Sequence, residues 1–168
     1  HAGLITKTVF PSEVVAVSVF LSSMIHHLIG VGLVMVASVI MTHSLSPLVV
    51  VLPVYMFFVG LLGVGIGWVA SSLHVYLRDT GQVLNVVMTV WLWMTPVMIS
   101  EDKIPADYRW VIRWNPMSFV VEAYRSRLLT AAWPDVGQLG IIAAYSVAVF
   151  VAGGFFFRHL KRGFADVL

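Results

Sequence analysis

Long apolar segments without formal charge alternate along the chain with short polar stretches. Asp, Glu, Lys and Arg are absent from three segments, residues 14–77, 80–100 and 136–157. A helix that crosses the hydrocarbon core of a membrane needs about 20 mainly apolar residues. The second and third segments therefore predict one membrane span each, and the first, about three times as long as a span, predicts two.

This pattern predicts an all-α integral membrane protein with four transmembrane helices. The first two are joined by a short, turn-like connection that ends at Pro47, so we expect them to form a hairpin. The spans are expected at about residues 20–42, 48–73, 82–98 and 136–157.

Residues 101–135, between the third and fourth spans, are more polar and predict two short amphipathic helices. Asn115 followed by Pro116 is typical of a helix start, and Trp110 and Trp114 supply apolar faces. Such a pair either lies on the membrane surface or re-enters the membrane. Non-spanning backbone survives at membrane depth only against protein or beside a water-filled cavity. The residue pattern is compatible with both arrangements.

The basic residues indicate how the spans are oriented. The tail, residues 158–168, contains three basic residues close to the end of the last span. Basic residues favour the cytoplasmic side of a membrane. With this tail in the cytoplasm, alternation of the spans places Lys7 and Arg78 inside as well, and residues 101–135 outside.

Composition excludes a soluble globular domain. Hydrophobic residues make up 60% of the chain and charged residues 11%, against roughly 45–50% and 25% in soluble domains. No cysteine is present, so the chain has neither a disulfide nor a thiolate metal site. The formal net charge of +2 is unremarkable, and no nucleic-acid partner is expected. Because the chain opens with His1 and a loop-like stretch, we expect a single transmembrane domain that is truncated at its N-terminus.

Polar and aromatic side chains inside the predicted spans are candidates for function. His26 and His27 fall near the middle of the first span, where polar side chains usually face a bundle interior or a watery cavity. Neighbouring helical residues point about 100° apart and no carboxylate lies nearby, so we expect packing or pathway lining and no metal site. Trp91 and Trp93 either contact lipid and other helices or line a glycan path, because sugar rings stack on aromatic rings.

Glycines are concentrated in the second span. Gly63, Gly67 and Ser71 recur every four residues and predict a face for close helix packing. The run of residues 60–67 superficially resembles a phosphate-binding loop, but it lies inside an apolar span and lacks the following Lys-Ser/Thr. Nucleotide binding is therefore not expected here, and any ATPase must reside on another subunit or domain.

Five short motifs occur in a fixed order among these spans. They are Lys7-Thr-Val-Phe-Pro-Ser-Glu13, Leu77-Arg-Asp79, Thr95-Pro-Val97, Trp114-Asn-Pro-Met117 and Tyr124-Arg125. In this order they resemble the type-2 ATP-binding-cassette (ABC) export permeases. The branch that exports O-antigen, capsule and teichoic acid is the most similar, and the resemblance covers essentially the whole chain.

The resemblance implies that the chain contains spans three to six of a six-span permease. Residues 7–18 would then form a cytoplasmic coupling helix that docks on the ATPase, together with the second cytoplasmic loop. The residues implied at this interface are Phe10, Pro11, Glu13, Arg78 and Asp79.

For residues 101–135 the resemblance implies a pair of short re-entrant gate helices on the external side. The residues implied in this gate segment are Pro96, Asn115, Pro116 and Arg125. Candidates for lining the path of the glycan are Trp91, Trp93 and His27.

The implied function is that of the permease subunit of an ATP-driven exporter, which moves a lipid-linked polysaccharide across the bacterial cytoplasmic membrane. Two copies would pair around a central path, and two ABC ATPase subunits would bind ATP and Mg²⁺. The permease itself would be no enzyme and would bind no cofactor. A drug or lipid exporter of the same superfamily and a non-transporting membrane scaffold are the alternatives. Ser12 stands where relatives commonly have a basic residue, and the sugar-specific parts are not recognisable, so the substrate stays open.

Overall fold

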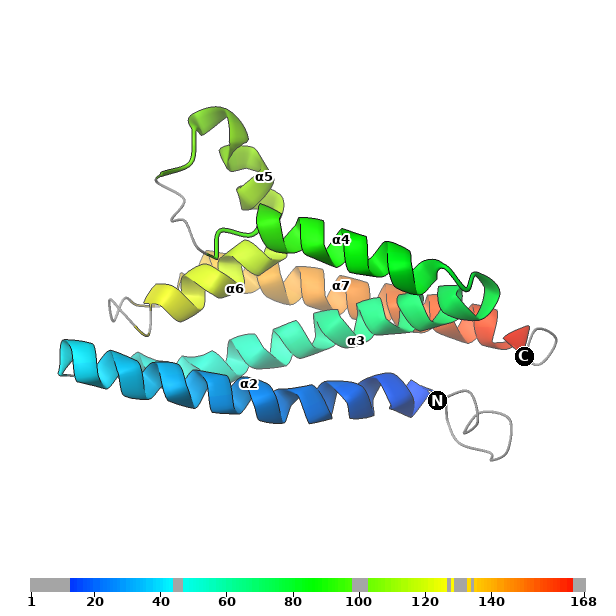
Figure 1. The fold of residues 1–168 in the computed structure, drawn as a ribbon, viewed down its shortest axis with the longest axis horizontal. Coiled ribbons are helices and arrows are strands. Elements are labelled where there is room, and N and C mark those ends of the chain that lie inside the picture. The colour runs from blue at the N-terminus through cyan, green and yellow to red at the C-terminus, as the bar shows by residue number, and fades with distance from the viewer. Residues whose placement is uncertain are drawn as a thin grey trace.

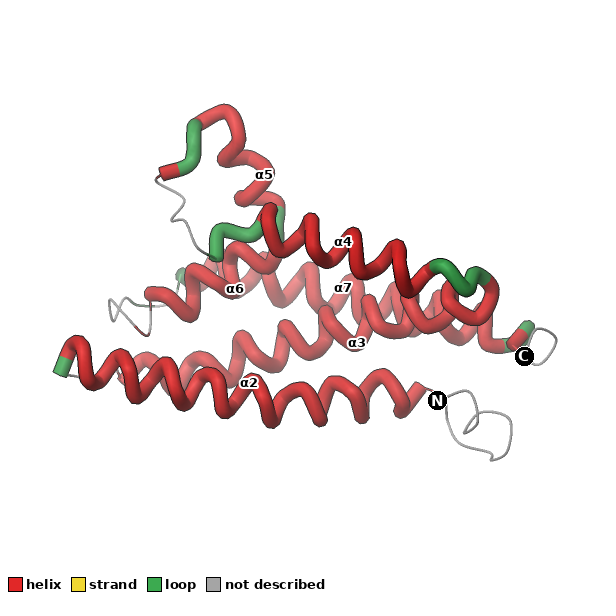
Figure 2. The backbone as a smooth tube through the Cα atoms, viewed as in Figure 1, coloured by secondary structure: helices red, strands yellow, loops and turns green. Residues whose placement is uncertain are grey.

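A computed structural model describes residues 13–43, 47–97, 103–126, 128, 133 and 135–164 of the chain. Within these residues the fold is helical and contains no strand (Figure 2). The long helices lie roughly along one axis, and the described residues begin and end at the same end of the molecule (Figure 1). The elements are α2 (Glu13–Thr42), the 3-10 turn η1 (Pro47–Val51), α3 (Leu52–Tyr76), α4 (Thr80–Met94), the 3-10 turn η3 (Ala106–Tyr108), α5 (Arg109–Trp114), α6 (Pro116–Arg125) and α7 (Val136–Lys161).

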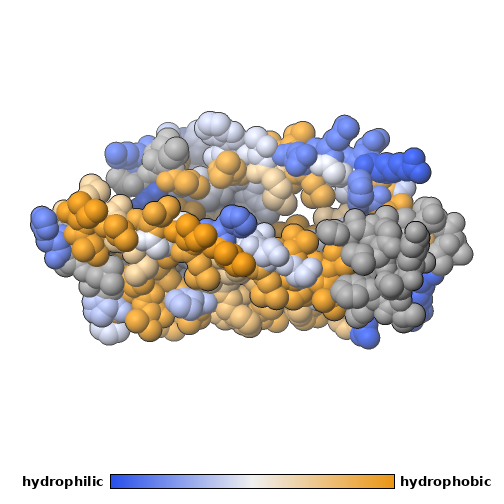
Figure 3. Space-filling view, turned by 60° about the horizontal axis from the view of Figure 1, so that its bottom comes forward, coloured by the Kyte–Doolittle hydropathy of each residue, from blue (hydrophilic) through white to orange (hydrophobic). Residues whose placement is uncertain are grey.

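Three helical segments among the described residues are long and apolar enough to cross a membrane. They are Val14–Met41, Pro47–Tyr76 and Val136–Lys161, and they match three of the four predicted spans. Figure 3 shows apolar side chains over most of one face, with many of the hydrophilic ones toward the ends. The chain is therefore an all-α, multi-pass membrane protein.

The remaining predicted span, residues 82–98, coincides with α4, which is shorter than expected. α4 has 15 residues, about 22 Å of helix, whereas the hydrocarbon core is about 30 Å thick. Pro96 explains the early end, because a residue that precedes proline is pushed out of the helical region. Thr95 is extended, with φ −94° and ψ 131°. Residue 98 lies outside the described residues.

α2 is one continuous helix where the sequence predicts two separate elements. The predicted coupling helix, residues 7–18, and the predicted span, residues 20–42, are distinct, yet α2 runs without a break from Glu13 to Thr42. No Gly or Pro occurs between residues 13 and 29, so nothing ends the helix near residue 19. Residues 7–12 lie outside the described residues.

α3 and α7 form the closest helix pair, and two glycines make this approach possible. A Cβ atom at Gly65 would lie 2.6 Å from the carbonyl oxygen of Val149, and one at Gly153 would collide with the backbone of Gly65. Small residues let membrane helices approach to backbone contact. Beside this contact, the ring of Trp68 lies 4.9 Å from that of Phe150, measured between centroids.

The predicted packing face of α3 is displaced from the observed one. Gly63 has no atom within 4 Å of its would-be Cβ, and Gly67 has only the Ala16 Cβ, at 3.8 Å. The contacts are made instead by Gly65 against α7 and by Gly60, against which the ring of Phe20 on α2 packs. The helix spacing is compatible with either set of glycines, and the position of the neighbouring helices selects one.

The short helix α6 lies between the spans and not on top of them. Its Val120 and Ala123 form one buried cluster with Tyr55 of α3 and Ile142 of α7. Ile142 lies more than one turn below the start of α7 at Val136, and Tyr55 lies in the first turn of α3, eight residues into the apolar segment that begins at Pro47. This packing against two spans favours the re-entrant arrangement of the two that the residue pattern allows, and re-entry into the membrane stays a prediction.

Candidate functional site

The hairpin formed by α5 and α6 is the least regular part of the membrane region. α5 projects away from the layer of long helices, and the chain turns back at Asn115 into α6 (Figure 1). Asn115 caps α6 because its Oδ1 accepts a hydrogen bond, 3.0 Å long, from the backbone N–H of Met117. Pro116 occupies the first helical turn, where no partner for its missing N–H is needed. The predicted helix start is confirmed.

The side chain of Asn115 also connects the hairpin to the end of α4. Trp91 donates its indole Nε1–H to Asn115 Oδ1 at 2.8 Å, and Asn115 Nδ2 donates to Thr95 Oγ1 at 2.9 Å. Asn115 is 7% exposed and Thr95 9% exposed. A buried amide must find partners for both its oxygen and its nitrogen, and here both sets of partners come from α4.

Arg125, at the other end of α6, makes the second connection to α4. Its Nη2 donates to the carbonyl oxygens of Pro96 at 2.9 Å and Val97 at 3.1 Å. These carbonyls follow the end of a helix at membrane depth, where an unpaired backbone group costs several kcal/mol. We call the set Trp91, Thr95, Pro96, Asn115 and Arg125 the hairpin clamp. It supplies hydrogen-bond partners for the polar groups just beyond the end of α4.

The structure brings three of the predicted gate residues into this clamp and places the fourth beside it. Pro96, Asn115 and Arg125 are connected through the bonds just given, and Pro116 follows Asn115. Thr95 had no predicted role of its own, although it lies in the Thr95-Pro-Val97 motif. That these residues form a gate stays a prediction.

The two tryptophans proposed to line a glycan path differ in their surroundings. Trp91 is partly buried and its N–H is used by Asn115, whereas Trp93 is 84% exposed on the opposite side of α4. Trp91 therefore has a structural partner within the hairpin clamp. A role of either ring in binding sugars stays a prediction.

His27, the third candidate for the glycan path, contacts the hairpin directly. Its Nε2 lies 2.9 Å from the hydroxyl oxygen of Tyr124 on α6, and the two rings meet edge to face at 5.7 Å between centroids. His26 points elsewhere and has its Nδ1 3.4 Å from the carbonyl oxygen of Ser22. In the part of the chain that the structure describes, no three His, Cys, Asp or Glu side chains come together as metal ligands.

An apolar groove of about 520 Å³ lies between α3, α4 and α6. Its lining includes Gly63 and Gly67 of the predicted packing face, of which only Gly67 has a neighbouring helix within reach, through Ala16 of α2. Trp91 of the hairpin clamp and Met117 of α6 close one part of it. With almost no polar atom in its lining, the groove suits an apolar chain or side chain and not a sugar.

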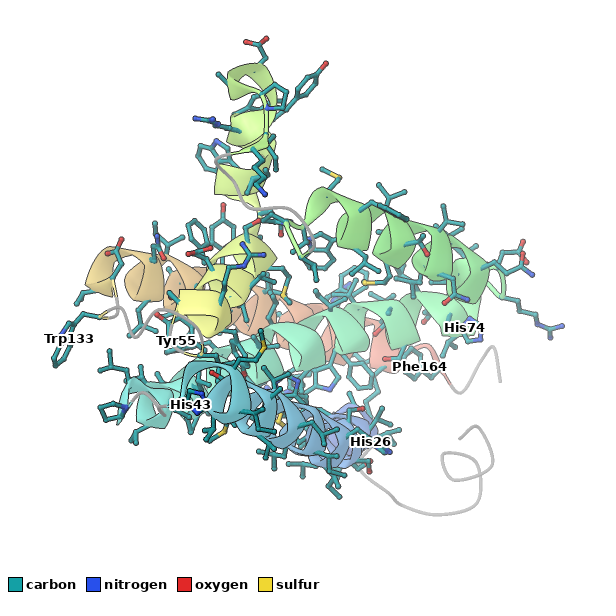
Figure 4. All side chains as sticks on the ribbon, turned by 60° about the vertical axis from the view of Figure 1, so that its left-hand side comes forward. His26, His43, Tyr55, His74, Trp133 and Phe164 are labelled. Atoms are coloured by element: carbon teal, nitrogen blue, oxygen red, sulfur yellow. The ribbon has the colours of Figure 1, made fainter. Side chains whose placement is uncertain are left out.

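The described members of the predicted ATPase-coupling set, Glu13, Arg78 and Asp79, lie at the end of the molecule that is remote from the hairpin (Figure 1). Glu13 is the first residue of α2, and Phe10 and Pro11 lie outside the described residues. Arg78 and Asp79 are exposed in the turn between α3 and α4, at the same end (Figure 1). Figure 4 shows His74 and Phe164 toward this end and His43 and Trp133 toward the other.

This end is held together by the last turns of α3 and α7. Tyr76 donates its hydroxyl to the carbonyl oxygen of Leu160 at 2.9 Å, and the rings of Tyr76 and Phe164 meet at 6.0 Å between centroids. The end of α3, from which the α3–α4 turn begins, is therefore held against the end of α7. Its docking to an ATPase stays a prediction.

The chain is similar in sequence to known membrane permeases. Over 175 aligned residues the chain is 26% identical to an O-antigen export system permease protein RfbA of Klebsiella pneumoniae, covering 100% of the chain and 65% of the relative. A second RfbA protein of this species is 24% identical with the same coverage. The RfbA protein of Myxococcus xanthus is 23% identical over 97% of the chain and 64% of its own length.

The chain thus spans 65% of the length of the first of these curated relatives. The family model described as "ABC-2 type transporter" matches residues 4–129, which include the hairpin clamp and the α3–α4 turn. That match extends over well more than half of the chain, and the chain belongs to the ABC-2 type transporter family.

Proposed function

We propose that the chain is the membrane domain, in part, of the permease subunit of an ATP-driven exporter that moves a lipid-linked polysaccharide across the bacterial cytoplasmic membrane. The observation that carries the proposal is the similarity of the whole chain to proteins named as O-antigen export permeases. The re-entrant hairpin supports it, because irregular backbone at membrane depth is tolerated where it borders a cavity or protein.

In the proposed mechanism two copies of the permease pair around a central path, and two ABC ATPase subunits bind ATP and Mg²⁺. Closure of the ATPases moves the coupling end, which includes Glu13 and the exposed Arg78–Asp79 turn. The spans then rearrange as nearly rigid bodies, and the hairpin opens or closes the path. The permease makes or breaks no bond of its substrate.

Deletion of the gene tests the proposed substrate. Export alone should fail, so lipid-linked glycan should accumulate on the cytoplasmic side while its synthesis continues. Surface glycan and cytoplasmic glycan are measured separately, with the wild-type gene returned on a plasmid as the control. Normal surface glycan in the deletion strain would refute the proposal, and would be the result for a drug or lipid exporter or a scaffold.

The coupling residues are tested by comparing two exposed aspartates. Asp79→Asn should lower substrate-stimulated ATPase activity of the purified complex about ten-fold, because the docking turn loses its charge. Asp107→Asn, at an exposed position on η3 near the hairpin, is the matched control and should leave this activity unchanged. Equal activity of both variants would exclude Asp79 from the interface.

A further inference from the structure

The gate helix α6 is hydrogen-bonded to two different spans. On one side the hairpin clamp connects it to α4 through Asn115 and Arg125. On the other side it meets α2, through the 2.9 Å contact of Tyr124 with His27. The Ser38 hydroxyl of α2 also donates to the carbonyl oxygen of Leu128, just beyond α6, at 2.6 Å. If α2 and α4 move relative to each other, the hydrogen bonds of one of these two sets must break.

The two sets differ in the charge of their donors. Each contains a buried side chain, Asn115 in the clamp at 7% exposed and Ser38 in the α2 set at 4% exposed, but only the clamp has a charged donor, Arg125, which binds two carbonyl groups. His27 is exposed on the surface of α2, so its hydrogen bond to Tyr124 lies at the exposed edge of the contact between α2 and α6. Because hydrogen bonds from charged donors are stronger than neutral ones, the α2 set is the one that yields first.

Packing gives the same order. Val120 and Ala123 of α6 are buried against α3 and α7, and α3 and α7 are joined at Gly65 and Gly153. α2 is the least buried of the spanning helices, with 6% of its most apolar window buried, against 39% for α3 and 17% for α7. α3, α6 and α7 therefore form one packed body, to which α4 is joined by the hairpin clamp, and α2 is the least buried of the three spanning helices.

α2 also connects the two regions that the proposed function requires to communicate. It begins at Glu13, in the predicted coupling segment, and contacts Tyr124 near its middle. The helical rise of about 1.5 Å per residue places His27 about 21 Å from Glu13 along one continuous helix. A displacement at the ATPase end is thus transmitted to the hairpin without crossing a loop.

From these contacts we infer that His27 and Tyr124, with Ser38 and Leu128, form a latch between α2 and the gate helix. When α2 is displaced, the latch opens and α6 remains with α4. Tyr124 and His27 are positioning residues, since they act by holding α6. This inference rests on the proposed function and adds to it the order in which the contacts of the hairpin are released.

Cross-linking tests the order of release, and the absence of cysteine from the chain makes it specific. The full-length permease with its ATPase is used, and any cysteine elsewhere in the permease is first replaced. One double variant, Ser38→Cys with Leu128→Cys, links α2 to the end of α6 through a short bismaleimide. The control, Leu92→Cys with Val121→Cys, links α4 to α6 across the apolar groove. Each is compared with its own unlinked form.

The α2 link should reduce glycan transport at least about ten-fold, because the latch can no longer open, and the α4 link should change it less than about two-fold. Transport by the α2-linked protein at the unlinked rate would overturn the latch, and so would loss of transport with the α4 link. Glycan transport by the unlinked wild-type complex tests the proposed function independently of the latch. If that complex moves no glycan at all, the function itself is wrong.

Removal of the latch hydrogen bond provides a second measurement. Tyr124→Phe deletes only the hydroxyl and should raise ATPase activity in the absence of glycan about five-fold, since one lost bond shifts the closed and open populations by about that factor. His27→Phe should have the same effect, and the double variant no more than either. Tyr145→Phe on α7 is the control. Additive effects of the two substitutions would contradict a shared bond.

Discussion

At the scale of single residues, Asn115 combines two functions that usually need two side chains. Its oxygen caps α6 and accepts from Trp91, while its nitrogen binds the end of α4. An aspartate would cap the helix equally well but could not donate to Thr95. This is a physical reason for an asparagine before Pro116, beyond its preference for helix starts.

Asn115→Ala should destabilise the folded protein by about 2 kcal/mol. A lost helix cap costs about 1 kcal/mol, and hydrogen bonds between membrane helices average about 0.6 kcal/mol each. The measurement is thermal unfolding of the purified full-length protein in detergent. Asn85→Ala, at an exposed position on α4, is the control and should leave the melting temperature unchanged. An equal effect of the two substitutions would exclude the hairpin clamp as a source of stability.

At the scale of elements, α4 and α6 together take the place of one long span. α4 stops at Met94. Asn115 and Arg125 of the hairpin clamp donate hydrogen bonds to the backbone carbonyl groups at this end. α6 then continues at membrane depth, packed against α3 and α7. The result is an apolar groove beside α4 and a polar hairpin that projects from the layer of spans.

Long helices were predictable from the sequence because lipid requires a long apolar run whatever the neighbours are. Helix starts were also predictable where a local side chain makes the cap, as at Asn115 and at Asp135, which accepts from the backbone N–H of Gly137. The early end of α4 was missed because the apolar run continues past it to residue 98, although Pro96 is a sequence signal for a helix end before it. The contact of His27 with Tyr124 bridges 97 positions and depends on the tertiary fold alone.

Gly65 of α3 contacts α7 and Gly63 does not, and this difference gives a prediction at the scale of elements. Gly65→Ala should destabilise the protein by about 1–3 kcal/mol, since the new methyl group meets the backbone of α7. Gly63→Ala, one register away, meets nothing within 4 Å and should be neutral or stabilise by up to about 1 kcal/mol through its helix propensity. Thermal unfolding of both variants in detergent is the measurement. Similar melting temperatures would mean that α3 does not pack on α7 through Gly65.

At the scale of the whole molecule, the basic residues nearest to the ends of the spanning helices α3 and α7 share one end of the molecule. The basic residues that end α7 and the exposed Arg78 lie at the end where α2 begins, whereas Trp133 lies at the other end (Figure 4). Basic residues remain preferentially on the cytoplasmic side during membrane insertion. The predicted orientation therefore places the coupling turn inside the cell and Trp133 outside.

Single cysteines in the full-length protein test this orientation, because the chain contributes no cysteine of its own. Trp133→Cys, at a position that is 82% exposed, should react with a membrane-impermeant maleimide in cells whose cytoplasmic membrane is intact. Arg162→Cys should react only after that membrane is permeabilised. The reverse labelling would invert the topology and with it the ATPase-coupling role of Arg78 and Asp79. Tyr108→Cys, 65% exposed beside α5, should be labelled from outside as well, because the predicted orientation places residues 101–135 on the external side.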